Sequence, residues 1–220
     1  MKNQANKSNF RNILLSSLLL IILGCHSSGE QKTEQKNLNE NKSTGIEINL
    51  KECIFSTKND QKNEGINMEI SYPCEWKIDN GQNQNVIKKF SKVNIDGSAI
   101  EEMLVITNMD MKLSETQITR LLSKENLSNG MDLEKDKLIT VERLLIDGKP
   151  SAKMVYETSL KNQGATIASV VVQYIIVHKE CLIRLQFGTF STTGVQANAL
   201  YLENKNLFTT LATKTKLYDN

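Results

Sequence analysis

The chain begins with a short basic and apolar leader, which restricts any folded core to the residues after it. Three basic residues and no acidic residue precede an apolar run that extends from Ile13 to Leu23. A membrane-spanning helix needs ~20 apolar residues, and this run has only about half that number. A basic start, a short apolar run and a polar boundary are together typical of an export signal.

The end of the apolar run, Ile22-Leu23-Gly24-Cys25, resembles a bacterial lipobox. The resemblance implies that residues 1–24 are a lipoprotein signal peptide, that the thiol of Cys25 carries a diacylglycerol, and that its amine takes an N-acyl chain. Two or more acyl chains hold a protein stably at a membrane. We expect anchoring at the periplasmic face of the outer membrane in a two-membrane cell, because His26 rather than an aspartate follows Cys25. An ordinary signal peptide, an uncleaved anchor, and an inner-membrane or surface location stay open.

Residues 25–45 are polar, with Leu38 as the single large apolar residue and no aromatic residue. Such a segment cannot bury enough apolar surface to offset its ordering entropy. It is predicted to be a flexible, disordered tether with a typical end-to-end span of roughly 25 Å. The tether would let the following domain move clear of the membrane.

Residues 46–220 are predicted to form one domain, long enough to bury a single core. Ile66, Met68, Ile70 and Tyr72 alternate with polar residues, which predicts a half-buried strand. Further strands are predicted at 86–92, 102–109, 137–146, 151–160, 166–177 and 182–187. The segment 166–177 is apolar at adjacent positions, so its strand should be central and covered on both faces.

Two helices and one tight turn are predicted between or after these strands. Ser114 and Gln117 have the spacing of a capping box, which predicts a helix from Ser114 to the stop at Asn129-Gly130. A second helix is predicted at 196–213, where it would cap the sheet. Asp147-Gly148 predicts a hairpin turn, because both positions tolerate a positive φ.

The order strands, helix, strands, helix, with Tyr72-Pro73-Cys74-Glu75-Trp76 ending an early strand, resembles the PsbP-like family of α/β/α sandwiches. That family includes the photosystem extrinsic subunit P and bacterial lipoproteins of the DcrB kind. The resemblance covers residues 46 to about 217. It implies an α+β fold with an antiparallel sheet flanked by helices, and a binding or assembly role without a shared catalytic centre. It transfers no functional residue to this chain.

Three cysteines remain once Cys25 is lipidated, and an exported protein can keep disulfides. If the chain after Cys53 folds back on the strand that ends at Tyr72, Cys53 and Cys74 face each other, and this is the favoured pair. Pairs of Cys181 with either of the other two stay open, as does the alternative of three buried thiols. Cys181 is expected to be the unpaired thiol.

Reactive motifs are missing from the sequence. It contains no Gly-x-Ser-x-Gly elbow, phosphate-binding glycine loop or Cys-x-x-Cys pair. We interpret His178 as a solvated loop residue, and Glu101 and Glu102 as solvated strand-edge charge whose side chains point to opposite faces. No catalytic residue, no metal site and no cofactor beyond the lipid on Cys25 are predicted.

Two hypotheses for function follow. The preferred one is a non-catalytic envelope lipoprotein that binds a protein partner or assists assembly. The alternative is a carrier of a small ligand or lipid in a groove between sheet and helix. Without the leader the chain has 24 basic and 25 acidic residues, a balance that argues against a nucleic-acid partner.

Overall fold

The computed structural model of the protein describes residues 51–132, 134–162 and 165–219. The predicted signal peptide, Cys25 and the predicted tether lie outside the described residues. The described elements are, in chain order, β1 (Glu52–Ser56), β2 (Asn67–Pro73), β3 (Lys77–Asn80), β4 (Val86–Val93), β5 (Ala99–Asn108), α2 (Glu115–Leu121), α3 (Lys124–Ser128), β6 (Lys137–Ile146), β7 (Lys149–Asn162), β8 (Ala165–His178), β9 (Cys181–Ser191), α4 (Gly194–Thr213) and β10 (Lys216–Tyr218).

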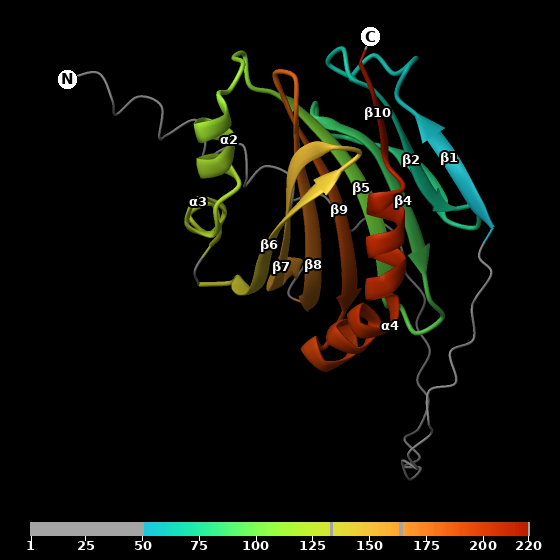
Figure 1. Cartoon of the computed structure of the whole chain (residues 1–220). Helices are drawn as coiled ribbons and strands as arrows, with labels where there is room; N and C mark the ends of the chain where they lie inside the picture. Colours follow the sequence, from blue (N-terminus) through green and yellow to red (C-terminus); the bar gives the residue numbers. More distant parts are fainter. Residues whose placement is uncertain (1–50, 133, 163–164, 220) are drawn as a thin grey trace, which may run out of the picture.

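The strands form two antiparallel sheets (Figure 1). The larger has the order β3-β4-β5-β9-β8-β7-β6, and the smaller has the order β1-β2-β10. The four strands β6 to β9 are neighbours in sequence order, as the predicted meander requires. Strand β8 is inside the large sheet and is buried on both faces from Ser169 onward. The prediction of an α+β fold with antiparallel strands and flanking helices is confirmed.

Each face of the large sheet has its own cover. On one face, the small sheet and α4 enclose the main core, to which the alternating residues Ile66, Met68, Ile70 and Tyr72 of the β2 segment all contribute. On the other face, α2 and α3 pack their leucines against β7, β8 and β9. The alternation in β2 therefore correctly predicted its buried side.

The turn between β6 and β7 has the backbone predicted from the sequence. Asp147 has a φ of 46° and Gly148 has a φ of 73°. Positive φ at both central residues is typical of a primed hairpin turn, whose twist matches that of the flanking strands. Asp147 also accepts a hydrogen bond from the backbone amide of Leu217, at 2.7 Å, and so joins this turn to β10.

The helix predicted from Ser114 to Asn129 is wrong in its length, because the structure divides it into α2 and α3. The capping box is present: the Ser114 hydroxyl accepts from the Gln117 amide, and the Gln117 side chain accepts from the Ser114 amide. Ser123 causes the division, since its hydroxyl accepts from the Asn126 amide and caps a second helix. A serine inside a helical pattern can start a new helix by bonding the backbone ahead of it.

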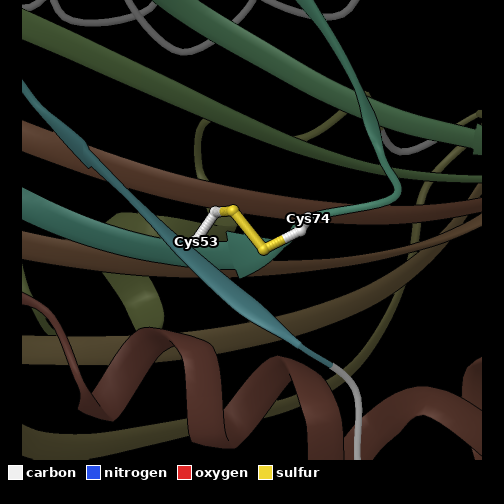
Figure 2. Close-up of a disulfide and its surroundings, with 2 residues drawn as sticks. All are labelled: Cys53 and Cys74. Atoms are coloured by element: carbon white, nitrogen blue, oxygen red, sulfur yellow. A yellow bond between two sulfur atoms is a disulfide. The ribbon is translucent and has the colours of Figure 1, made fainter.

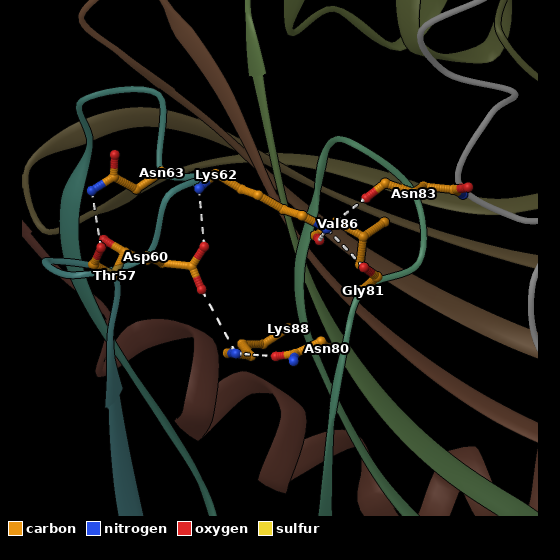
Figure 3. Close-up of polar contacts among 9 residues, drawn as sticks. All are labelled: Thr57, Asp60, Lys62, Asn63, Asn80, Gly81, Asn83, Val86 and Lys88. Atoms are coloured by element: carbon orange, nitrogen blue, oxygen red, sulfur yellow. Dashed lines mark hydrogen bonds and ion pairs between the residues drawn. The ribbon is translucent and has the colours of Figure 1, made fainter.

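Lys62 links two loops by hydrogen bonds near the start of β4 (Figure 3). Its ammonium donates to the carbonyl oxygens of Gly81 at 2.8 Å, Asn83 at 3.2 Å and Val86 at 3.3 Å. Nearby, Lys88 lies 3.7 Å from Asp60 in an ion pair. The loop between β1 and β2 is thereby fixed to the loop between β3 and β4.

Candidate functional site

A disulfide joins Cys53 in β1 to Cys74 just after β2, with the Cα atoms 5.0 Å apart (Figure 2). Of the pairings that the sequence left open, this is the one that the structure contains. The strand register places Cys53 opposite Tyr72, so the two cysteines are offset rather than directly opposite. The disulfide attaches the edge strand β1 to the end of β2.

Cys181 is the one described cysteine outside the disulfide, and it is buried. Burial raises the pKa of its thiol, and its Sγ donates weakly to the carbonyl oxygen of Glu64 at 3.9 Å. A thiol in these surroundings is a poor nucleophile. Cys181 therefore acts as a small apolar residue of the main core.

His178 lies opposite Cys181 in the β8–β9 hairpin, and its interpretation as a solvated residue is wrong. Only 4% of its surface is exposed. Its Nε2 is 3.6 Å from an Asp219 oxygen. Burial and the nearby ammonium of Lys149 lower the pKa of His178, which keeps the imidazole neutral.

Glu101 and Glu102 do point to opposite faces of the sheet, but neither is solvated. Glu101 forms a 2.7 Å ion pair with Lys89, and burial still raises the pKa of its carboxyl despite that neighbour. Glu102 is 1% exposed between its cross-strand neighbours Phe90 and Phe187. Burial alone raises the pKa of Glu102 well above its ordinary value. Burial in the main core therefore favours the protonated form of the Glu102 carboxyl, because the neutral form costs less to bury.

A seam of buried polar side chains crosses the sheet face beneath α2 and α3. Gln173 donates to the Gln186 side-chain oxygen at 2.8 Å and to the Tyr156 hydroxyl at 3.2 Å. Arg184, one row further along β9, is also buried. This seam separates the apolar cluster under the helices from a smaller cluster on β4 and β5. We name Tyr156, Gln173, Arg184 and Gln186 the polar seam.

Some polar atoms at and near the seam lack a hydrogen-bond partner among the described residues. They are the side-chain oxygen of Gln173 and the hydroxyl of Ser169. Buried polar groups are normally satisfied by protein or by ordered water. In the sequence, Leu182, Arg184 and Gln186 alternate with apolar residues. That alternation alone is typical of a strand with one face in solvent, so it does not predict a buried polar seam.

No arrangement for metal chemistry occurs in residues 51–132, 134–162 and 165–219, where no three His, Cys, Asp or Glu side chains gather as a ligand set. Within the same ranges, no helix combines the length and apolar character that crossing a membrane requires. The polar seam and the Glu102 carboxyl are thus the chemically notable features of the described domain.

Comparison with known proteins identifies the architecture. No protein-family model and no curated protein matches the chain. The solution structure of cyanobacterial PsbP (CyanoP) from Synechocystis sp. PCC 6803 is 17% identical and matches 82% of this chain and 99% of that one, with a TM-score of 0.51. The domain has a PsbP-like fold. The resemblance drawn from the element order and the Tyr-Pro-x-x-Trp segment is confirmed at the level of the fold.

Two further solved structures match this chain with lower TM-scores. PA94 from Pseudomonas aeruginosa, a protein of unknown function, is 12% identical over 69% of this chain and 92% of that one, with a TM-score of 0.44. LpqN of Mycobacterium tuberculosis, described as involved in cell envelope biogenesis, is 8% identical over 76% of this chain and 92% of that one, with a TM-score of 0.47.

Proposed function

We propose that this protein is a non-catalytic, lipid-anchored protein of the cell envelope that binds a protein partner or assists envelope assembly. The observation that carries the proposal is Cys25 at the end of the leader, in the sequence Ile22-Leu23-Gly24-Cys25. The Cys53–Cys74 disulfide supports export, because disulfides persist mainly in oxidising compartments.

The anchor is tested by growth with a fatty-acid analogue that can be detected after labelling. The wild-type protein should take up the label, and the Cys25→Ser variant should not. Intact-mass analysis of the wild-type protein should find residues 1–24 removed and the acyl groups on Cys25. An unlabelled chain, or one cut at another bond with an unmodified thiol, contradicts the proposed anchor and location.

The edge strand β6 supports a protein-binding role. It is ten residues long, β7 is its one partner among the described strands, and its Leu145 side chain is 67% exposed. An edge strand can accept an extended segment of another protein through its free backbone groups. A register shift between Leu138 and Thr140 interrupts the start of β6, so the regular part runs from Thr140 to Ile146.

A photo-crosslinking residue at position 145 tests this surface in living cells. We expect it to trap a discrete partner, whereas the same residue in place of Leu202, exposed on α4, should not. Equal crosslinking at both positions, or none at 145, argues against partner binding through β6.

The polar seam favours a second candidate function, a small-ligand carrier. The buried side-chain oxygen of Gln173, which has no hydrogen-bond partner among the described residues, would be satisfied by a ligand with a donor group, such as a hydroxylated compound. Native mass spectrometry of protein purified from cells should then detect a retained small molecule in the wild type and not in Gln173→Leu. Protein that carries only water leaves the partner-binding role as the better account.

A further inference from the structure

One end of the domain presents three aliphatic side chains to solvent. Val93 is 64% exposed, Ile95 is 109% exposed and Val195 is 85% exposed. Val93 ends β4, Ile95 lies in the turn to β5, and Val195 lies in the first turn of α4. We name these three residues the apolar tip.

Polar contacts hold the two parts of the apolar tip together. The Gln196 side chain donates to Asp96 at 2.6 Å and accepts from the Ser191 hydroxyl at 2.5 Å. Asp96 also accepts from the amide of Ser98 at 3.0 Å and from its hydroxyl at 2.6 Å. The β4–β5 turn and the start of α4 are thus joined, so the apolar tip is preorganised and loses little further conformational freedom on binding.

The described chain begins near the same end of the domain. The carbonyl of Lys51 accepts from the amide of Cys74 at 2.9 Å, directly before β3. Strand β3 starts at Lys77, opposite Ser91, which is two residues before Val93. Figure 1 shows the β4–β5 turn and the start of α4 at the bottom of the view, and the C-terminal end at the top. Lys51, the first described residue, therefore lies on the side of the domain that carries the apolar tip.

We propose that the apolar tip contacts the lipid surface to which Cys25 anchors the protein. This inference rests on the proposed function. Isolated aliphatic side chains at protruding turns enter the boundary between headgroups and acyl chains, a surface that needs no shape complementarity. Exposed Lys92 adjoins the tip and exposed Asp96 lies within it, so their charges offset each other and the contact depends on the aliphatic side chains. Three side chains on two turns are too few for the area of a stable protein interface, which favours lipid over a protein partner.

Tryptophan fluorescence in brominated vesicles tests the contact. The full chain, purified with its anchor, is reconstituted into vesicles of phosphatidylcholine and phosphatidylglycerol whose acyl chains carry bromine. Variants Ile95→Trp and Val195→Trp place a reporter in the apolar tip, and Leu145→Trp places one at the end of β6 next to the Asp147–Gly148 turn. The native Trp76 is buried in the main core, so wild-type emission gives a constant background.

We expect the emission of the tip reporters to fall by roughly half or more while the emission at position 145 is unchanged. Equal quenching at all three positions, or no quenching at 95 and 195, overturns the proposal. The failure of the anchor is distinguishable, because intact-mass analysis of the same sample reports on Cys25 alone. If that sample carries no lipid, brominated vesicles are added to it, and quenching at 95 and 195 still reports whether the tip binds lipid.

Discussion

Glu101 and Glu102 are neighbours in β5, yet the sheet gives their carboxyl groups opposite surroundings. Glu101 is paired with Lys89 at 2.7 Å on the sheet face that also carries α2 and α3, in the part formed by β4 and β5. Glu102 points into the main core between Phe90 and Phe187, and its Oε2 has no hydrogen-bond partner among the described residues. One strand therefore carries an ion pair on one face and, on the other, a buried carboxyl whose pKa is raised.

The Glu102→Gln variant should flatten the pH dependence of stability. The folded-state pKa of Glu102 is raised above its unfolded value near 4.5, so the folded chain keeps a proton that the unfolded chain loses. The contribution of Glu102 to the free energy of unfolding is full below pH 4.5 and is lost as the pH rises through the folded pKa. The variant has no proton to lose, so its free energy of unfolding should fall less than that of the wild type as the pH rises above 4.5.

Urea unfolding followed by Trp76 fluorescence measures this difference at each pH. The Glu75→Gln variant, at an exposed position nearby, is the matched control and should follow the wild type. Parallel stability curves for wild type and Glu102→Gln would show that Glu102 is ionised in the folded protein.

Removal of the partner of Glu101 should destabilise the domain. In Lys89→Met the Glu101 carboxyl keeps its burial and loses its counter-ion, which should cost about 3 kcal/mol. The double variant Lys89→Met/Glu101→Gln should recover most of that loss, and urea unfolding of the four proteins gives the coupling energy. Lys77→Met breaks an exposed ion pair with Asp79 and should change stability by less than about 1 kcal/mol. Additive single effects would contradict the pairing.

Local patterns predicted local structure well. The alternation from Ile66 to Tyr72 identified the buried side of β2, and Asp147-Gly148 identified a turn whose backbone angles the structure reproduces. The capping box at Ser114 located the start of α2 to the residue. In each case, the determining interactions lie within a few residues along the chain.

Burial of the polar side chains could not be predicted in the same way. Glu102, Arg184 and His178 lie beside apolar residues in their strands, but their neighbours in sequence do not show that these polar side chains are covered. Their cover depends on which segments pack on each side of the sheet, and those segments are distant in sequence: Asp219 lies over His178, and Tyr156 of β7 meets the Gln173 of β8. The polar seam is a property of the assembled sheet, and no single strand contains its pattern.

Reduction of the Cys53–Cys74 disulfide should destabilise the domain by about 3 kcal/mol, the value for a loop of this length. The double variant Cys53→Ala/Cys74→Ala should show the same loss and no further response to reductant. Because β1 has β2 as its one partner in the described part of the chain, hydrogen exchange should rise first in β1. The Cys181→Ala variant is the control, since it should keep its sensitivity to reductant. An unfolding midpoint that reductant leaves unchanged in the wild type would contradict the role of the disulfide.

The Lys62→Met variant should release the two loops that Lys62 joins (Figure 3). Methionine has a similar length but donates no hydrogen bond, so the carbonyls of Gly81, Asn83 and Val86 lose a charged donor. A hydrogen bond to a charged group contributes about 1.5 to 3 kcal/mol to stability. Because the Lys62 side chain is only partly buried, water can replace some of the lost bonds, and we expect the free energy of unfolding to fall by about 2 kcal/mol. Hydrogen exchange should accelerate in residues 57–66 and 81–86 together, because one side chain fixes both loops. Lys58→Met, which changes an exposed lysine of the same loop, should leave both segments protected. Faster exchange in only one of the two loops would mean that they are held independently of Lys62.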